Sequence, residues 1–211
     1  MNLRGKFITF EGSEGSGKST HIRRLVRRLQ AAGAETFVTR EPGGTPLGEE
    51  IRHLLLHHHS GGIMNPETEL LLFAAARAEL VRERIAPALA AGQVVVCDRF
   101  LDSTTVYQGA ARRLAAGTVA TINRFAVGDC PPDLTLVLDV PVEVSQARVS
   151  DRGDDKADRI EREDSDFFRR VREGYLALAE AEPRRIAVLD STQPIDQVES
   201  AIWNIVNERL A

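Results

Sequence analysis

The sequence has little cysteine and no long apolar run, and each absence excludes a class of protein. Cys97 and Cys130 lie too far apart to form a C-x-x-C pair, so a disulfide framework or a cysteine metal site is not expected. No apolar stretch could span a bilayer, and residues 1–6 lack the charged and apolar regions of a signal peptide. We therefore expect a soluble, cytoplasmic protein without a membrane partner.

An excess of positive charge is absent as well. The 211 residues carry a formal net charge of −4, which argues against a protein whose main partner is nucleic acid. No internal repeat or low-complexity tract occurs, and 43% hydrophobic residues suffice for one sizeable core. We therefore expect a single domain over residues 1–211, with any phosphate binding confined to a local site.

The most specific feature that is present lies near the N-terminus. A P-loop pattern, G-x-x-x-x-G-K-[ST], is matched by Gly12-Ser13-Glu14-Gly15-Ser16-Gly17-Lys18-Ser19. An apolar run over 7–10 precedes it, and helical periodicity begins at Thr20. In a P-loop, backbone N–H groups cradle phosphates, the lysine reaches the β and γ phosphates, and the hydroxyl binds Mg²⁺. Residues 12–20 are thus the predicted ATP site, and a glycine-rich turn with a surface lysine is the alternative.

Strand and helix patterns alternate along the rest of the chain. Strands are expected over 36–39, 93–97, 134–138 and 185–189, with helical patterns between them. A long helix is expected over 66–91, and the helical pattern over 101–126 is interrupted near Gly109 and Gly117. This alternation predicts an α/β fold with a doubly wound, five-stranded parallel sheet, whose ligands bind where the strands end.

Acidic and loop residues follow the expected strands. Asp98 ends a buried strand, where P-loop proteins usually place the Mg²⁺ carboxylate, and an ion pair with Arg99 is the alternative. Glu11 ends the first strand, and we count it with Ser19 and Asp98 as a candidate metal ligand. The loop over 40–46 follows the second strand and is either a ligand loop or a plain proline and glycine turn.

Two further stretches have an unusual composition. His57-His58-His59 ends a helical pattern, and neighbours on a helix project about 100° apart, so an exposed helix end is expected rather than a metal site. Residues 148–162 are densely charged, which is typical of a solvated loop or of a mobile lid in a phosphoryl-transfer enzyme. Phe73 and Arg77 are four residues apart and share a helix face, a spacing that also occurs in cores.

Taken in order, these motifs resemble the thymidylate kinase family over nearly the whole chain. The specific elements are T-R-E-P-G-G-T over 39–45, D-R-F with S-T-x-x-Y-Q-G over 98–109, and D-R-I-E over 158–161. The resemblance implies transfer of the γ-phosphoryl group of ATP to dTMP, giving dTDP and ADP. It also implies Mg²⁺ as cofactor and a homodimer, for which the apolar faces of the helices around Leu47 and Leu70 are candidate surfaces unless they are buried in the monomer core.

The resemblance further implies how dTMP is bound. Phe73 would stack on thymine while Arg77 donates to a base carbonyl. Tyr107 would lie against the sugar, where a ribose 2′-hydroxyl would clash, and Glu14 would face the 3′-hydroxyl. The remaining expected dTMP contacts are Arg40, Pro42, Arg99, Ser103 and Gln108.

The catalytic cations are expected from three places. Lys18 lies in the P-loop, and Arg99 would hold the acceptor phosphate. Positions 13–16 contain no lysine or arginine. The resemblance therefore implies that the catalytic arginine lies in a lid over about 148–161, as in bacterial members. Arg148 and Arg152 are the candidates. Catalysis would then consist of positioning and charge neutralisation.

A P-loop alone is also compatible with other functions. A GTPase would need N-K-x-D and D-x-x-G motifs, but the nearest match, over 155–158, lacks the asparagine and no D-x-x-G follows Asp98. A non-catalytic nucleotide-binding module would not require both the Phe73 and Arg77 pair and a lid. A kinase for another nucleoside monophosphate stays open from the sequence alone.

Overall fold

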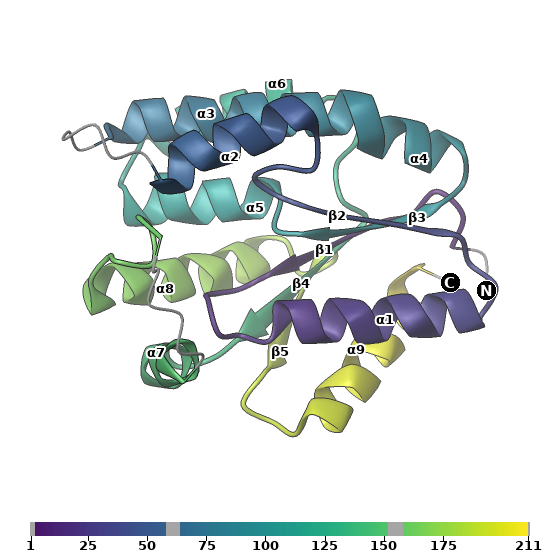
Figure 1. The fold of residues 1–211 in the computed structure, drawn as a ribbon. Coiled ribbons are helices and arrows are strands. Elements are labelled where there is room, and N and C mark those ends of the chain that lie inside the picture. The colour runs from purple at the N-terminus through teal and green to yellow at the C-terminus, as the bar shows by residue number, and fades with distance from the viewer. Residues whose placement is uncertain (1–2, 58–63, 152–157, 211) are drawn as a thin grey trace.

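A parallel sheet forms the centre of the computed structural model, which describes residues 3–57, 64–151 and 158–210 (Figure 1). The strand order is β2-β3-β1-β4-β5, and all pairings are parallel. The strands are β1 (Phe7–Glu11), β2 (Thr36–Arg40), β3 (Val94–Asp98), β4 (Leu134–Asp139) and β5 (Ile186–Asp190). This arrangement confirms the expected five-stranded α/β fold.

The central strand positions the P-loop. All residues of β1 are buried, because helices cover both faces of the sheet and the strand has a partner on each side. Phe10 is level with Asp98 of β3 and with Leu136 of β4. The loop after β1 therefore starts between the carboxyl ends of two neighbouring strands, which is where open α/β sheets bind ligands.

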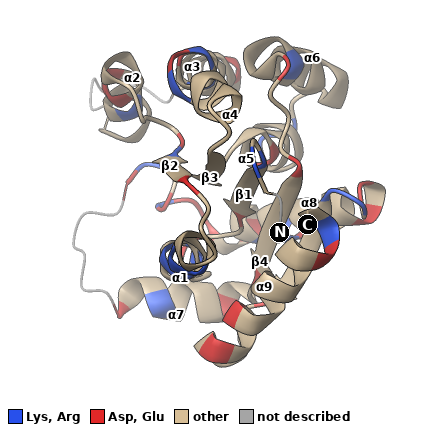
Figure 2. Cartoon of the chain, turned by 90° about the vertical axis from the view of Figure 1, so that its right-hand side faces the viewer, with Lys and Arg blue, Asp and Glu red and all other residues tan. Residues whose placement is uncertain are grey.

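One face of the sheet is covered by the first and last helices. α1 (Lys18–Ala31) and α9 (Ile195–Leu210) pack on Ile8, Phe10 and the inward side chains of β4 (Figure 1). Figure 2 shows basic residues on α1 and acidic residues on α9. Arg24 of α1 pairs with Asp196 at 2.7 Å and also with Glu199. These contacts fix the helix that follows the P-loop.

The opposite face is covered by a helix that changes its winding. α3 (Pro66–Leu80), a π-helical segment η1 (Val81–Ile85) and α4 (Ala86–Ala90) run on without interruption and pack on β1 and β3. The long helix expected over 66–91 is therefore present, with a π-helical insertion that its periodicity did not indicate. Cys97 is buried in this cluster, and both cysteines are free thiols.

Beside α3, further helices surround the carboxyl end of the sheet. They are α2 (Pro46–His57), α5 (Leu101–Thr104), a π-helical segment η2 (Thr105–Ala111), α6 (Ala116–Val127), α7 (Val142–Ser150) and α8 (Ser165–Ala181). The expected interruption of the helical pattern over 101–126 is present between the two glycines, at residues 112–115, whereas Gly109 lies within η2 and Gly117 in the first turn of α6. His57 ends α2, whereas His58 and His59 lie outside the described residues.

No helix in the described ranges is both long and apolar enough to cross a membrane.

Candidate active site

The P-loop follows β1 and turns directly into α1. The turn requires glycine, because Gly12, Gly15 and Gly17 have φ angles of 132°, 70° and 91°. A Cβ on Gly12 would lie 2.5 Å from the carbonyl oxygen of Leu138 in β4. The loop therefore packs closely against the end of β4. The first turn of α1 lines a cleft at the carboxyl end of the sheet.

Lys18 is held across the P-loop. Its side chain is buried, and Nζ donates to the carbonyl oxygens of Gly12 at 3.0 Å and Ser13 at 2.9 Å. Burial, followed by the nearby charge of Arg99, lowers the pKa of Lys18. Ser16 is also fully buried, so the loop contributes its side chain to packing.

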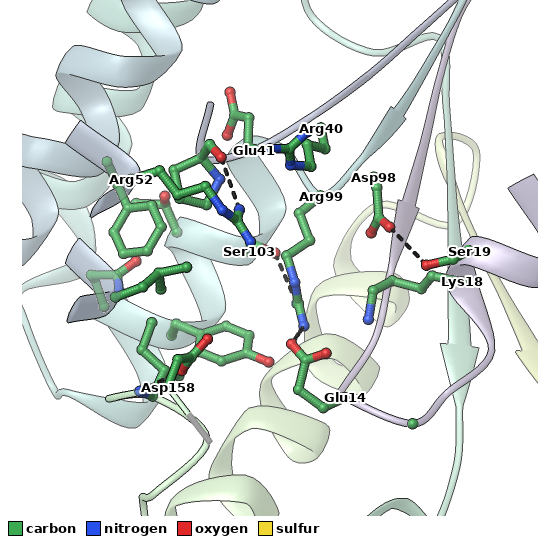
Figure 3. Close-up of a pocket in the computed structure, with 18 of the residues that line it drawn as sticks. Glu14, Lys18, Ser19, Arg40, Glu41, Arg52, Asp98, Arg99, Ser103 and Asp158 are labelled. Atoms are coloured by element: carbon green, nitrogen blue, oxygen red, sulfur yellow. Dashed lines mark hydrogen bonds and ion pairs between the residues drawn. The ribbon is translucent and has the colours of Figure 1, made fainter. Parts of the chain in front are cut away.

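Ser19 and Asp98 meet at the start of α1. The Ser19 hydroxyl donates to the Asp98 carboxylate at 3.5 Å, and both side chains line the cleft (Figure 3). A hydroxyl and a carboxylate oxygen are ligands that suit Mg²⁺, which usually takes few protein ligands together with substrate phosphates and water. The described residues contain no group of three or more His, Cys, Asp or Glu side chains that could hold a metal. These two residues fit Mg²⁺ of that kind.

Glu11 is not part of this pair, contrary to expectation. Its side chain is fully buried and does not line the cleft. The carboxylate accepts from the Phe100 amide at 2.8 Å, the Ser103 hydroxyl at 2.6 Å and the Tyr175 hydroxyl at 2.8 Å. Burial, followed by the charge of Asp102, raises its pKa. Protein donors thus occupy its oxygens in this structure, and its expected role as a metal ligand stays a prediction.

A cleft of about 200 Å³ begins at the P-loop and extends toward α2 and α3 (Figure 3). The P-loop residues that line it are Glu14, Gly15, Gly17, Lys18, Ser19 and Thr20. The expected dTMP contacts that line it are Glu14, Arg40, Pro42, Phe73, Arg99, Ser103, Tyr107 and Gln108. Residues from both expected sites therefore face one continuous space.

Arg99 lies between the two groups of residues. It forms an ion pair with Glu14, and its guanidinium carbon lies 5.2 Å from the ring centroid of Tyr107. Its φ of 66° is uncommon for a residue other than glycine and is typical of functional sites. Although burial opposes it, the Glu14 carboxylate raises the pKa of Arg99 well above its usual range. The cleft thus keeps a permanent cation at its centre.

Arg77 does not line the cleft in this structure, and its expected contact with a base stays a prediction. The side chain is 1% exposed and donates to Glu41 at 2.6 Å, Asn123 at 2.8 Å and Thr104 at 2.9 Å. Glu41, which follows β2, lines the cleft, whereas Arg77 does not. Burial, opposed by the charge of Arg77, raises the pKa of Glu41 to about 7. The four-residue spacing identified the helix face correctly, but not the buried carboxylate that binds the guanidinium.

The two lid arginines are not both described. Arg148 lies at the end of α7 and donates to the carbonyl oxygens of Gly15 at 3.3 Å and Ser191 at 3.1 Å. It contacts the outside of the P-loop and does not line the cleft. Arg152 lies outside the described residues.

Several cleft residues were not expected from the sequence. Arg52 of α2 lines the cleft and donates to the Pro42 carbonyl at 2.9 Å. Burial, followed by the charge of Arg40, lowers its pKa. Asp158 and Ile160 also line the cleft. Arg52 follows the 39–45 motif by about two helical turns, and that distance was the available signal.

Comparison with known proteins agrees with this geometry. A model of the thymidylate kinase family matches residues 10–202. The thymidylate kinase of Pseudomonas fluorescens (strain SBW25) is 53% identical over 200 residues, covering 95% of this chain and 94% of the relative. That of Thermomicrobium roseum is 52% identical over 202 residues, covering 96% and 94%. That of Geobacter sulfurreducens is 48% identical over 210 residues, covering 98% of each. The chain belongs to the thymidylate kinase family.

Proposed function

We propose that this cleft is where the chain carries out the reaction of its family. The chain is an ATP-dependent dTMP kinase, a phosphotransferase of nucleotide biosynthesis that converts dTMP to dTDP. The supporting observation is the position of Arg99 between the P-loop lysine and the ring of Tyr107. A cation there lies where the anionic groups of a donor and an acceptor would meet.

On the donor side, residues 12–20 would bind the phosphates of ATP. The backbone N–H groups and the helix N-terminus favour an anion, and Lys18 would neutralise the β and γ phosphates. Ser19 and Asp98 would hold Mg²⁺, which when bound neutralises phosphate charge. Lys18 and Arg99 together orient the two anionic partners without a proton-transfer group, since a phosphomonoester is mostly dianionic at neutral pH.

On the acceptor side, aromatic and basic side chains from separate elements would bind dTMP. Phe73 would stack on the base and Tyr107 would border the sugar. Arg99 would bind the acceptor phosphate, with Glu14 fixing its guanidinium and facing the 3′-hydroxyl. Ser103, Gln108, Arg40 and Pro42 complete this side of the cleft. We assign Arg77 the indirect task of holding Glu41 at the cleft wall.

We further propose one domain with a short lid at about 148–161. The absence of a lysine or arginine at positions 13–16 supports the bacterial arrangement, in which the lid supplies the catalytic arginine. Arg148 is engaged with the carbonyl oxygens of Gly15 and Ser191, which leaves Arg152 as the favoured contact to the transferred group.

A homodimer is proposed from exposed apolar side chains on neighbouring helices. Leu71 of α3 is 57% exposed and Phe125 of α6 is 80% exposed, and Leu47 and Leu54 of α2 are also exposed. Leu70, by contrast, is buried in the monomer. A second copy covering α2, α3 and α6 would remove this apolar surface from water. Sedimentation of the wild type and of Phe125→Glu tests it, with a monomeric variant as the expected result.

Substrate selection is tested with purified protein. We expect ADP formation from ATP and Mg²⁺ with dTMP as acceptor, and much slower turnover with dUMP, CMP or AMP. Formation of dTDP identifies the product directly. ATP binding without dTDP formation would instead indicate a non-catalytic nucleotide-binding module.

A further inference from the structure

Glu69 is a buried carboxylate on the helix that carries Phe73. It is 1% exposed and lies one helical turn before Phe73, which itself lies one turn before Arg77. The three residues therefore form one stripe along α3. Phe73 lines the cleft, Arg77 holds Glu41 at one end of the stripe, and Glu69 occupies the other end.

Three side chains from two other segments converge on Glu69. Gln108 of η2 donates to it at 2.7 Å, and Arg112, just after η2, lies 3.3 Å away. Arg159 approaches it to 2.6 Å. These donors and charges outweigh the desolvation of the carboxylate, so the pKa of Glu69 is lowered and the group stays ionised.

Arg159 also fastens its own segment to α2. Its Nε donates to the Leu55 carbonyl at 3.0 Å and its amide to the Leu56 carbonyl at 3.3 Å. Arg159 and Glu69 form an ion pair through Nη2 of Arg159 and Oε2 of Glu69. The contact does not have hydrogen-bond geometry, because Nη2 has no partner at hydrogen-bonding angles. The hydrogen bonds thus hold the guanidinium on α2, and the charge of Glu69 draws it toward α3.

The residues next to these contacts line the acceptor side of the cleft. Asp158 and Ile160 flank Arg159, and the Asp158 carboxylate accepts from the Ile160 amide at 2.8 Å. Gln108 follows Tyr107, and both line the cleft. The Glu69 carboxylate therefore contacts residues of two segments that line the cleft, η2 and 158–163, and it lies on the helix that carries Phe73.

We propose that Glu69 is a positioning residue for the acceptor site. Its charge holds Arg159 and its oxygens hold Gln108, which keeps the 158–163 segment and η2 at the spacing that a thymidine monophosphate requires beside Phe73. This inference rests on the proposed acceptor role of the cleft. It assigns Glu69 no contact with substrate and no effect on the donor phosphates, because its contacts run to Gln108 of η2, to Arg112 just after η2 and to Arg159 of the 158–163 segment.

The test is Glu69→Gln, which preserves size and removes the charge. Leaving two arginines without their carboxylate should raise KM for dTMP by about tenfold, with KM for ATP changed by less than about twofold. Hydrogen exchange of peptides over 158–163 should become faster, while exchange over 12–20 stays as in the wild type. Glu67→Gln is the matched control, since Glu67 is exposed on the same helix, and it should change neither quantity.

Arg159→Gln provides a second, independent test. It should raise KM for dTMP in the same direction, and Glu69→Gln/Arg159→Gln should be no worse than the larger single effect, because both changes break one connection. If Glu69→Gln fails to fold, Arg159→Gln alone decides the matter. An unchanged KM for dTMP, or equal rises in both KM values, overturns the inference. A wild type that makes no dTDP overturns the proposed function instead, so the two failures are distinct.

Discussion

Arg77 and Glu41 form an ion pair of 2.6 Å in which the side chains are only 1% and 3% exposed. Removing one partner of such a pair leaves a buried charge uncompensated, at a cost of about 3 to 5 kcal/mol. We predict that Arg77→Ala lowers the free energy of unfolding by that order and raises KM for dTMP, because Glu41 lines the cleft. Denaturant titration and initial rates measure the two effects. Wild-type stability with selectively weakened dTMP binding would restore the direct base contact expected from the sequence.

The same pair should make stability depend on pH. The pKa of Glu41 rises from 4.5 to about 7 on folding, mainly through burial, with Arg77 opposing the rise. The folded chain therefore holds the proton more tightly, and this contribution to stability is present at low pH and is lost as pH rises from 4.5 to 7. The unfolding free energy of the wild type minus that of Glu41→Gln should accordingly fall between pH 5 and pH 7. Urea titrations at both values provide the measurement, and a constant or rising difference contradicts the prediction.

Lys18→Ala should abolish most turnover while the protein remains folded. The lysine contacts P-loop carbonyls rather than the hydrophobic core, so its loss removes a charge from the donor site without opening a cavity. Loss of one such electrostatic contact lowers kcat by about a hundredfold or more. Steady-state rates and the circular dichroism spectrum are compared with those of the wild type. Near-normal turnover would be incompatible with the donor site proposed for the P-loop.

Glu11 and Asp98 should respond differently to magnesium. Asp98→Asn is expected to raise the Mg²⁺ concentration needed for half-maximal rate, because its carboxylate lies with Ser19 at the cleft. Glu11→Gln is expected to reduce stability and kcat without that change, because its oxygens hold Phe100 and Ser103. Magnesium titrations of both variants separate the two tasks. A larger magnesium requirement for Glu11→Gln than for Asp98→Asn would indicate that Glu11 is a metal ligand.

The two lid arginines should also differ. Arg148→Ala removes donors from the Gly15 and Ser191 carbonyls, so we expect it mainly to raise KM for ATP. Arg152→Ala should lower kcat by at least about tenfold with little change in KM for dTMP, since a catalytic cation acts chiefly in the transition state. Full kinetic profiles with both substrates distinguish these effects. If both variants kept the wild-type kcat, the lid would not supply the catalytic cation.

The sheet and the P-loop could be predicted because their signals are local. A glycine motif, an apolar strand and a helical period all lie within a short window, and the continuous apolar run of β3 indicated a strand buried on both faces. Motif order then identified most of the cleft residues. Position along a strand or helix was therefore enough to place these residues at the cleft, though not to name their partners.

The contacts that the sequence did not indicate involve buried charged groups whose partners are distant in sequence. The acceptor oxygens of Glu11 are satisfied in part by Tyr175, which is 164 residues away, and Arg77 is held by Glu41, 36 residues away. No short window contains both members of either pair. Glu69 was missed for the same reason, since it looks like an ordinary charged residue on a helix until its neighbours Gln108 and Arg159 are known.

The packing of α1 against α9 bears on how this protein is made. The P-loop opens α1, and that helix rests on the inward face of α9, which contains residues 195–210, with Arg24 paired to Asp196 and Glu199. During synthesis from the N-terminus, the phosphate-binding loop is made well before residues 195–210, which support its helix. β1 likewise cannot pair on both sides until β3 and β4, which follow it in the sequence, have been made. A nascent chain halted before residue 195 would expose the apolar side of α1, the helix that carries the P-loop lysine.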